Sequence, residues 1–310
     1  KDGRLAVLAP KGAHRCRRLV HAKNFDTVFN HLETNPMTNH LFGILLLFFS
    51  PGPLFAGEIM FEGYYRVELQ GKQIGYTILR YEFEPKTSIF EAKSFLRVKF
   101  GDKIVQESTK AKATDKFKPI SYQYTSQVGD EIHAVDATFS GEVMKTTFSD
   151  GKKVRTENSK IPKGTFLSSF LPYLMLQQKL EIGQNFQYSA VAEEDGASYA
   201  GKAMMQSKEV KPGYELFTVL NRFKGEEFIS KMAIVKDGKG EKNVKGEVFG
   251  TLSPAKNLST RLMGSAALAT EGQVVPNKIL LTVFGGIPSG KINMVAEPAV
   301  IPTPVPKTGP

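Results

Sequence analysis

Hydrophobic and polar residues alternate along the chain from residue 57 to about residue 251. Successive side chains of a strand point to opposite faces of its sheet, so this rhythm predicts half-buried strands. Short connections, most of them containing Gly, separate the runs, which is typical of antiparallel hairpins in sequence order. Strands and helices do not alternate, and this argues against a doubly wound nucleotide-binding fold. The runs are YYRVELQ (64–70), IGYTILRYEFE (74–84), SIFEAKSFLRVKF (88–100), KIVQESTKAKA (103–113), ISYQYTSQV (120–128), IHAVDATFS (132–140), VMKTTFS (143–149), FQYSAVAEE (186–194), SYAGKAMMQSKEV (198–210), YELFTVLNRF (214–223) and FISKMAIVK (228–236).

Two segments break the alternation and have features typical of helices. In residues 164–183 four apolar residues recur at i, i+3, i+4 and i+7, and Pro172 either kinks this helix or starts a second helical piece. In residues 253–269 Ser253 is a candidate N-cap and Pro254 a candidate first helical residue. The apolar face of the first helix either fills the core or closes a hydrophobic cavity; its residues, the candidate ligand-lining set, are Leu167, Phe170, Leu171 and Leu174.

These elements predict a mainly β (α+β) fold. We expect a curved antiparallel sheet or half-open barrel of sequential hairpins, with one or two helices packed on it or plugging it.

The segment before the alternating region has the shape of a secretory signal peptide. Residues 41–49 form a short apolar core, which prolines end before it could span a membrane, and cleavage is expected between Ala56 and Gly57. A buried core helix is the alternative. Because no Lys or Arg lies between Met37 and the apolar core, we hypothesise that translation starts at Met37 and that residues 1–36 are a disordered leader or a mis-called extension.

The segment assignments divide the chain into four parts. They are a leader (1–36), a signal peptide (37–56), a single β-rich domain (57–292) and a Pro-rich tail (293–310). The tail is expected to be extended and polyproline-like, and its prolines cannot donate sheet hydrogen bonds. The domain is expected to be periplasmic, with membrane contact at most peripheral.

Composition removes several chemistries from residues 57–310. The single cysteine of the chain, Cys16, precedes this region, and His133 is its one histidine, so disulfides, Cys–His dyads and a structural zinc site are excluded. A Ser-His-Asp triad would need His133, which lies in an alternating strand and is expected to be a surface residue. The whole chain has a net charge of +10, of which residues 57–310 carry +6 (34 Lys and Arg against 28 Asp and Glu), and these charges alternate along the chain, a pattern of solvated faces rather than of a nucleic-acid groove. We therefore expect no metal, no cofactor and no nucleic-acid partner.

A glycine-rich stretch near the end of the chain fits the spacing G-x-x-x-x-G-K. It spans residues 285–291 and follows a β-prone run at 279–284. A phosphate-binding loop needs a Ser or Thr after the lysine to bind magnesium and a helix beginning at the loop. Ile292 occupies the hydroxyl position, and Pro288 removes an amide donor. We interpret the stretch as a turn and expect no nucleotide.

The densest acidic cluster is Glu193-Glu194-Asp195-Gly196. In a strand Glu193 and Asp195 would share one face, which makes them the best candidates for a carboxylate-dependent hydrolase. The Asp-Gly pair, however, marks a hairpin turn, where exposed charges are routine. We expect no catalytic residues, and the hydrolase remains an alternative.

Three stretches resemble a bacterial periplasmic family of unknown function. YYRVELQGKQIGY (64–76) is similar to its opening hairpin, and IPKGTFLSSFLPYLM (161–175) and IGQNFQYSAVAEEDG (182–196) are similar to its central helix and following strand. The resemblance spans about residues 59–250. It implies a half-open antiparallel barrel related to outer-membrane lipoprotein carriers, in which helices plug a hydrophobic concave face. It implies no catalytic residue.

Two further functions remain open beside the hydrolase. The first is a non-enzymatic envelope module that binds a lipid, a lipoprotein or another hydrophobic ligand in its concave sheet. The second is a scaffolding protein that binds another envelope protein through its Pro-rich tail or a sheet edge.

Overall fold

A computed structural model describes residues 57–151, 153–178, 181–235, 245–263, 266–270, 275 and 277–285 of the 310-residue chain. The leader, the signal peptide with Ala56, the Pro-rich tail and residues 286–292 of the glycine-rich stretch lie outside the described residues. None of the described helices is long and apolar enough to cross a membrane.

The described chain consists mainly of strands. The first eight are β1 (Glu58–Leu69), β2 (Lys72–Glu84), β3 (Ile89–Phe100), β4 (Lys103–Thr114), β5 (Pro119–Val128), β6 (Glu131–Ser140), β7 (Val143–Asp150) and β8 (Lys153–Lys160). The remaining elements are β9 (Phe166–Leu167), the 3₁₀ helix η2 (Ser168–Phe170), α1 (Leu171–Gln177), β10 (Asn185–Ala192), β11 (Ala197–Lys211), β12 (Tyr214–Phe223), β13 (Glu226–Val235), β14 (Lys245–Ser253), β15 (Leu258–Leu262), α2 (Ala266–Thr270) and α3 (Asn277–Phe284).

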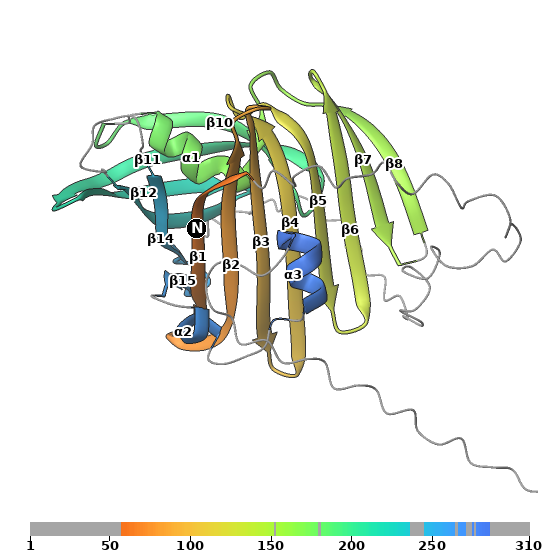
Figure 1. The fold of residues 1–310 in the computed structure, drawn as a ribbon, viewed down its shortest axis with the longest axis horizontal. Helices are drawn as coiled ribbons and strands as arrows, with labels where there is room; N and C mark the ends of the chain where they lie inside the picture. Colours follow the sequence, from red (N-terminus) through yellow and green to blue (C-terminus); the bar gives the residue numbers. More distant parts are fainter. Residues whose placement is uncertain are drawn as a thin grey trace, which may run out of the picture. The chain divides into compact units, whose positions relative to one another are not determined.

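All fifteen strands belong to one open sheet, in the order β8-β7-β6-β5-β4-β3-β2-β1-β15-β14-β13-β12-β11-β10-β9. Neighbours are antiparallel except the short pair β9–β10, which is parallel. The sheet curves so far that β9, at one end of the order, contacts β4 near the middle. Figure 1 shows the strong curve of the sheet. The edge strands β8 and β9 do not pair with each other. The predicted curved sheet of sequential hairpins is confirmed, and all eleven predicted runs fall on strands.

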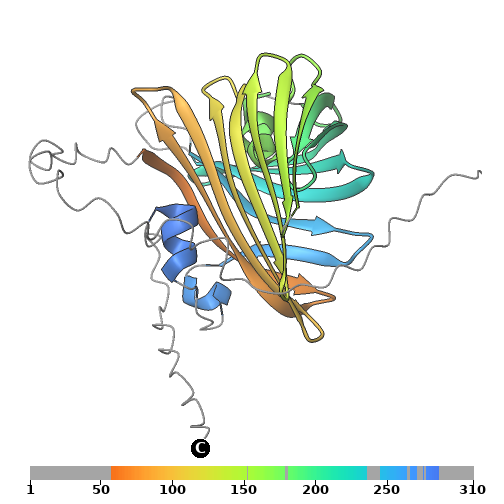
Figure 2. The same cartoon turned by 90° about the vertical axis from the view of Figure 1, so that its right-hand side faces the viewer.

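Each face of the sheet carries its own hydrophobic core, because the alternation supplies apolar side chains to both. The concave face holds the larger cluster, which is rich in aromatic residues and includes Tyr81, Tyr122 and Phe170. The smaller cluster lies on the opposite face, where Tyr76, Ile78 and Phe95 are buried beneath α2 and α3. Figure 2 shows α1 on one side of β2–β4 and the two C-terminal helices on the other.

The predicted helix over residues 253–269 is wrong in its first part. Ser253 ends β14, and residues 254–257 form the turn to β15, with Pro254 at a position where turns favour proline and Asn257 in the left-handed region (φ 49°). Among the described residues of this stretch, only those that belong to α2 are helical. The Ser-Pro pair that resembled a helix start is therefore a hairpin signal.

The β preference of the run at 279–284 is also misleading, because these residues form most of the helix α3. Its apolar residues Leu280, Val283 and Phe284 are buried on the outer core, while Leu281 is exposed. That spacing is helical, and packing against the sheet overrides the β preference of the individual residues. Gly285 follows the helix with φ 69° and donates its N–H to the Leu281 carbonyl at 3.1 Å, as a helix C-terminal glycine does.

A buried ion network lies beside this outer core, on the convex face of β1–β3. The Arg80 guanidinium donates to Glu62 at 2.7 Å and to Glu82 at 3.3 Å, and Lys93 reaches Glu82 at 2.8 Å. The end of α3 covers Arg80, because Phe284 accepts a hydrogen bond from it at 3.4 Å and places its ring 5.3 Å from the guanidinium carbon. The side chains of Arg80 and Glu62 are only 7% and 6% exposed.

We predict that Arg80→Met lowers the free energy of unfolding by about 3–5 kcal/mol, because it leaves the buried Glu62 without its cation. The matched control is Arg222→Met, which breaks the exposed Arg222–Glu227 pair (65% and 39% exposed) and should cost less than about 1 kcal/mol. Urea unfolding of both variants measures the difference. Equal, small losses in the two variants would contradict the role given to the buried network.

Candidate functional site

The concave face of the sheet is occupied by a plug, which we define as η2 and α1, residues 168–177. Pro172 stands in the first turn of α1, where its missing N–H costs no helical hydrogen bond, so it starts this second helical piece. The predicted helix over 164–183 is thereby shortened: residues 166–167 form β9, and α1 ends at Gln177. Residues that were expected to form one helix instead enter the barrel as strand, 3₁₀ turn and helix.

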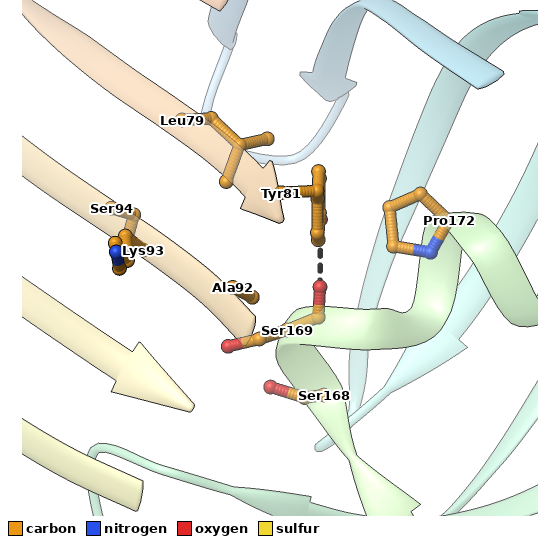
Figure 3. A pocket seen from close by; sticks show the side chains of 8 residues that line it. All are labelled: Leu79, Tyr81, Ala92, Lys93, Ser94, Ser168, Ser169 and Pro172. Atoms are coloured by element: carbon orange, nitrogen blue, oxygen red, sulfur yellow. Dashed lines mark hydrogen bonds between the residues drawn. The ribbon is translucent and has the colours of Figure 1, made fainter. Parts of the chain in front are cut away.

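Tyr81 of β2 is the main contact of the sheet with the plug. Its hydroxyl donates to the Ser169 carbonyl at 2.7 Å (Figure 3). Its ring packs edge-on against Tyr173, with centroids 4.6 Å apart, and also lies near Phe170. Burial raises the pKa of Tyr81 well above its ordinary value, helped by the neighbouring Tyr173 and Glu193. The phenol therefore remains a neutral hydrogen-bond donor.

Glu193 is the second polar contact of the plug. It follows β10, is 3% exposed, and accepts hydrogen bonds from the Ser168 hydroxyl and, at 3.0 Å, from the Ser169 N–H. Burial raises the pKa of this carboxyl above its ordinary value of 4.5, while the hydrogen bonds from Ser168 and Ser169 lower it. The expectation that the charges of this turn are all exposed is wrong for Glu193, because the β10–β11 turn packs inside the curved sheet.

A cavity of about 240 Å³ separates the start of the plug from the inner face of β2 and β3. Its walls are mostly apolar, with serine hydroxyls as the polar groups, and the Lys93 ammonium belongs to the convex-face ion network, where Glu82 and Glu91 hold it. Figure 3 shows its lining residues, which are Leu79, Tyr81, Ala92, Lys93, Ser94, Ser168, Ser169 and Pro172. These walls suit a small, uncharged, largely apolar group.

The four predicted ligand-lining residues lie on the plug or just before it. Leu167 and Phe170 are fully buried in the inner core, whereas Leu171 and Leu174 are partly buried against it. None of the four lines the cavity described above. The residues that do line it include Ser168 and Ser169, a polar pair in an apolar stretch, and that interruption is the signal from which the sequence could have located the contact.

The structure directs the two candidate hydrolase carboxylates to different partners. Glu193 binds the plug, whereas Asp195 accepts from the Tyr199 hydroxyl at 2.8 Å and pairs with Lys224 at 2.7 Å. Lys224 also pairs with Glu194 at 2.6 Å. His133 lies on β6 and contacts Asp150 of β7, with both side chains substantially exposed. No group of three or more His, Cys, Asp or Glu residues within the described part of the chain is arranged to bind a metal.

Two further hydroxyls on the inner face have no hydrogen-bond partner among the described residues. Tyr122 and Thr146 are each 1% exposed, and they flank the small Ala137 in one row across β5, β6 and β7. Burial is the main cause that raises the pKa of Tyr122, followed by the charge of Glu193. Sequence patterns did not indicate this pair, because alternation shows which residues face inward and not which remain unpaired.

Comparisons with known proteins give distant similarities in fold outline. No protein-family model matches the sequence, and no curated protein matches it. The chain is similar to a β-barrel-like protein of the domain of unknown function DUF1849 from Brucella abortus, with 10% identity, a TM-score of 0.46, and 65% of this chain and 94% of that one covered. It is also similar to a DUF1089 family protein from Pseudomonas aeruginosa, with 12% identity, a TM-score of 0.33, and 58% and 90% covered. With TM-scores this low, neither protein bears on the function of this chain.

We predict that Glu193→Gln reduces the pH dependence of the free energy of unfolding. A carboxyl with a raised pKa in the folded state stabilises the fold below its unfolded pKa near 4.5, and this contribution is lost as the pH rises through the folded pKa. The unfolding free energy of the wild type should therefore fall, relative to Glu193→Gln, as the pH rises through that window.

Denaturant unfolding at a series of pH values measures this difference. The matched control is Glu194→Gln in the same turn, because the Glu194 side chain is 45% exposed and pairs with Lys224 rather than with the plug. A constant difference between wild type and Glu193→Gln across the window would show that Glu193 is not held in an ionisation-sensitive environment.

Proposed function

We propose that this chain is an exported bacterial envelope protein that binds a hydrophobic ligand in the concave face of its sheet and catalyses no reaction. The plug carries this proposal. It covers an aromatic, apolar surface with a three-residue 3₁₀ helix and a seven-residue helix, and a cavity remains beneath it. Export is supported by the signal-peptide pattern of residues 37–57, and the family resemblance supports a lipid or lipoprotein as the ligand.

The contacts of the plug support exchange with a ligand. Its polar attachment to the sheet and to the β10–β11 turn includes the Tyr81 hydrogen bond and the hydrogen bonds from Ser168 and Ser169 to Glu193. Its apolar attachment rests on the buried side chains of Phe170 and Met175, whereas Leu171 and Leu174 are only partly buried. An incoming apolar group thus has to replace a limited set of contacts, and the inner aromatic side chains would then line its site.

We predict that Ala92→Leu weakens the binding of a neutral apolar fluorophore of the naphthylamine class by about tenfold. Ala92 lines the cavity on β3, and the larger side chain fills space that the ligand would enter. The matched control is Ala255→Leu, an exposed alanine of the β14–β15 turn, which should leave binding unchanged. Fluorescence titration measures both affinities, and native mass spectrometry of the gently purified protein reports a co-purified ligand.

Absence of binding by the wild type, together with a clean apo mass, would overturn the proposal. Equal loss in the two variants would instead place the binding surface away from the cavity.

A further inference from the structure

The plug itself shows which chemistry the concave face recognises. Three of its groups satisfy the inner polar residues: the Ser168 hydroxyl and the Ser169 N–H donate to Glu193, and the Ser169 carbonyl accepts from Tyr81. The side chains on either side, Leu167 and Phe170, are fully buried. The concave face is therefore complementary to a peptide backbone that donates and accepts at neighbouring positions, flanked by apolar side chains.

Any ligand that displaces the plug has to replace these hydrogen bonds. A buried carboxyl left without donors is destabilising, and a buried phenol left without an acceptor is destabilising to a smaller extent. The carboxylate of a fatty acid offers acceptors only and brings a negative charge toward Glu193. The neighbouring Glu194 and Asp195 increase this repulsion, and Lys224 already pairs with both. An ionised fatty acid is thus a poor substitute for the plug.

We propose that the ligand of the concave face is an apolar peptide segment, whose amide N–H binds Glu193 and whose carbonyl binds the Tyr81 hydroxyl. This inference rests on the proposed binding function and names the class of ligand. A peptide with a small hydroxylated residue next to an aromatic or aliphatic one reproduces each contact of residues 167–170. The apolar side chains supply affinity, and the two polar contacts select an amide over an acid.

The experiment uses the full chain with its plug weakened. The plug competes at a high effective concentration because it belongs to the same chain, so Phe170→Ala removes one of its buried apolar contacts and leaves Glu193 and Tyr81 in place. The probe is a fluorescein-labelled, C-terminally amidated peptide with the sequence of residues 165–174, TFLSSFLPYL. The control peptide carries Ser169→Pro, which removes the N–H that binds Glu193.

We predict that Phe170→Ala binds this peptide at least about tenfold more tightly than the wild type and more tightly than it binds the proline control. Adding Glu193→Ala should lower the affinity by about tenfold, because the hydrogen bond from the peptide N–H to the buried carboxyl is lost. Adding Glu194→Ala should not lower it. Tyr81→Phe should weaken binding, whereas Tyr122→Phe, which removes an unpaired hydroxyl on the same face, should not. If Phe170→Ala unfolds, Phe170→Leu is used in the same comparisons.

A parallel titration with a fluorescent hexadecanoic acid distinguishes failure of the peptide assignment from failure of the proposed binding function. Strong fatty-acid binding that Glu193→Ala leaves unchanged, together with no peptide binding, would overturn the peptide assignment and retain the lipid-binding function. If neither probe binds to the wild type or the weakened-plug variant, the binding function itself is wrong. Equal affinity for the two peptides also overturns the assignment, because it removes the amide contact to Glu193.

Discussion

The pairing of β1 with β15 is the constraint on which the rest of the structure depends. It joins residues about two hundred positions apart, such as Tyr65 and Leu262, and it is the one link through which β1–β8 and β9–β15 form a single sheet. Every other neighbouring pair joins elements close in sequence, so these two meanders can form from local contacts. The plug lies where the chain passes from one meander to the other and contacts Tyr81 of the first and Glu193 of the second. Its site thus exists only when both halves are joined.

Buried charges serve different purposes on the two faces of this sheet. On the convex face Arg80 and Lys93 are balanced by neighbouring carboxylates, and the end of α3 covers the network, so that its ions are mutually satisfied. On the concave face Glu193 has no cation among its described contacts and depends on donors from the plug. A balanced network is costly to open, whereas a lone carboxyl is satisfied by any segment that supplies suitable donors. The concave face is therefore the one suited to exchange.

The sequence predicted the fold well where alternation was strong and poorly where it was absent. The alternating runs located β1–β7 and β10–β13, but β8 (KVRTENSK) has all eight residues exposed and so carries no apolar rhythm. A Ser-Pro pair is common both at helix starts and in hairpin turns. Only the pairing of β14 with β15 shows that Ser253-Pro254 belongs to a turn. The burial of Glu193 was not predictable, because it depends on a turn of one meander packing against the inner face of the other.

The small size of the cavity decides how the concave face can work. Pockets that enclose drug-sized ligands are typically about 300–1,000 Å³, and the cavity beside the plug is about 240 Å³. A cavity of about 150 Å³ already holds a benzene ring, so a ligand much larger than a small aromatic molecule has to displace part of the plug. The apparent affinity of such a ligand is then reduced by the free energy needed to displace the plug. Selectivity then follows from this difference: a ligand that fails to satisfy Glu193 and Tyr81 competes against a segment that already does. The inner core and the proposed binding site are consequently the same surface, which the plug occupies in this structure.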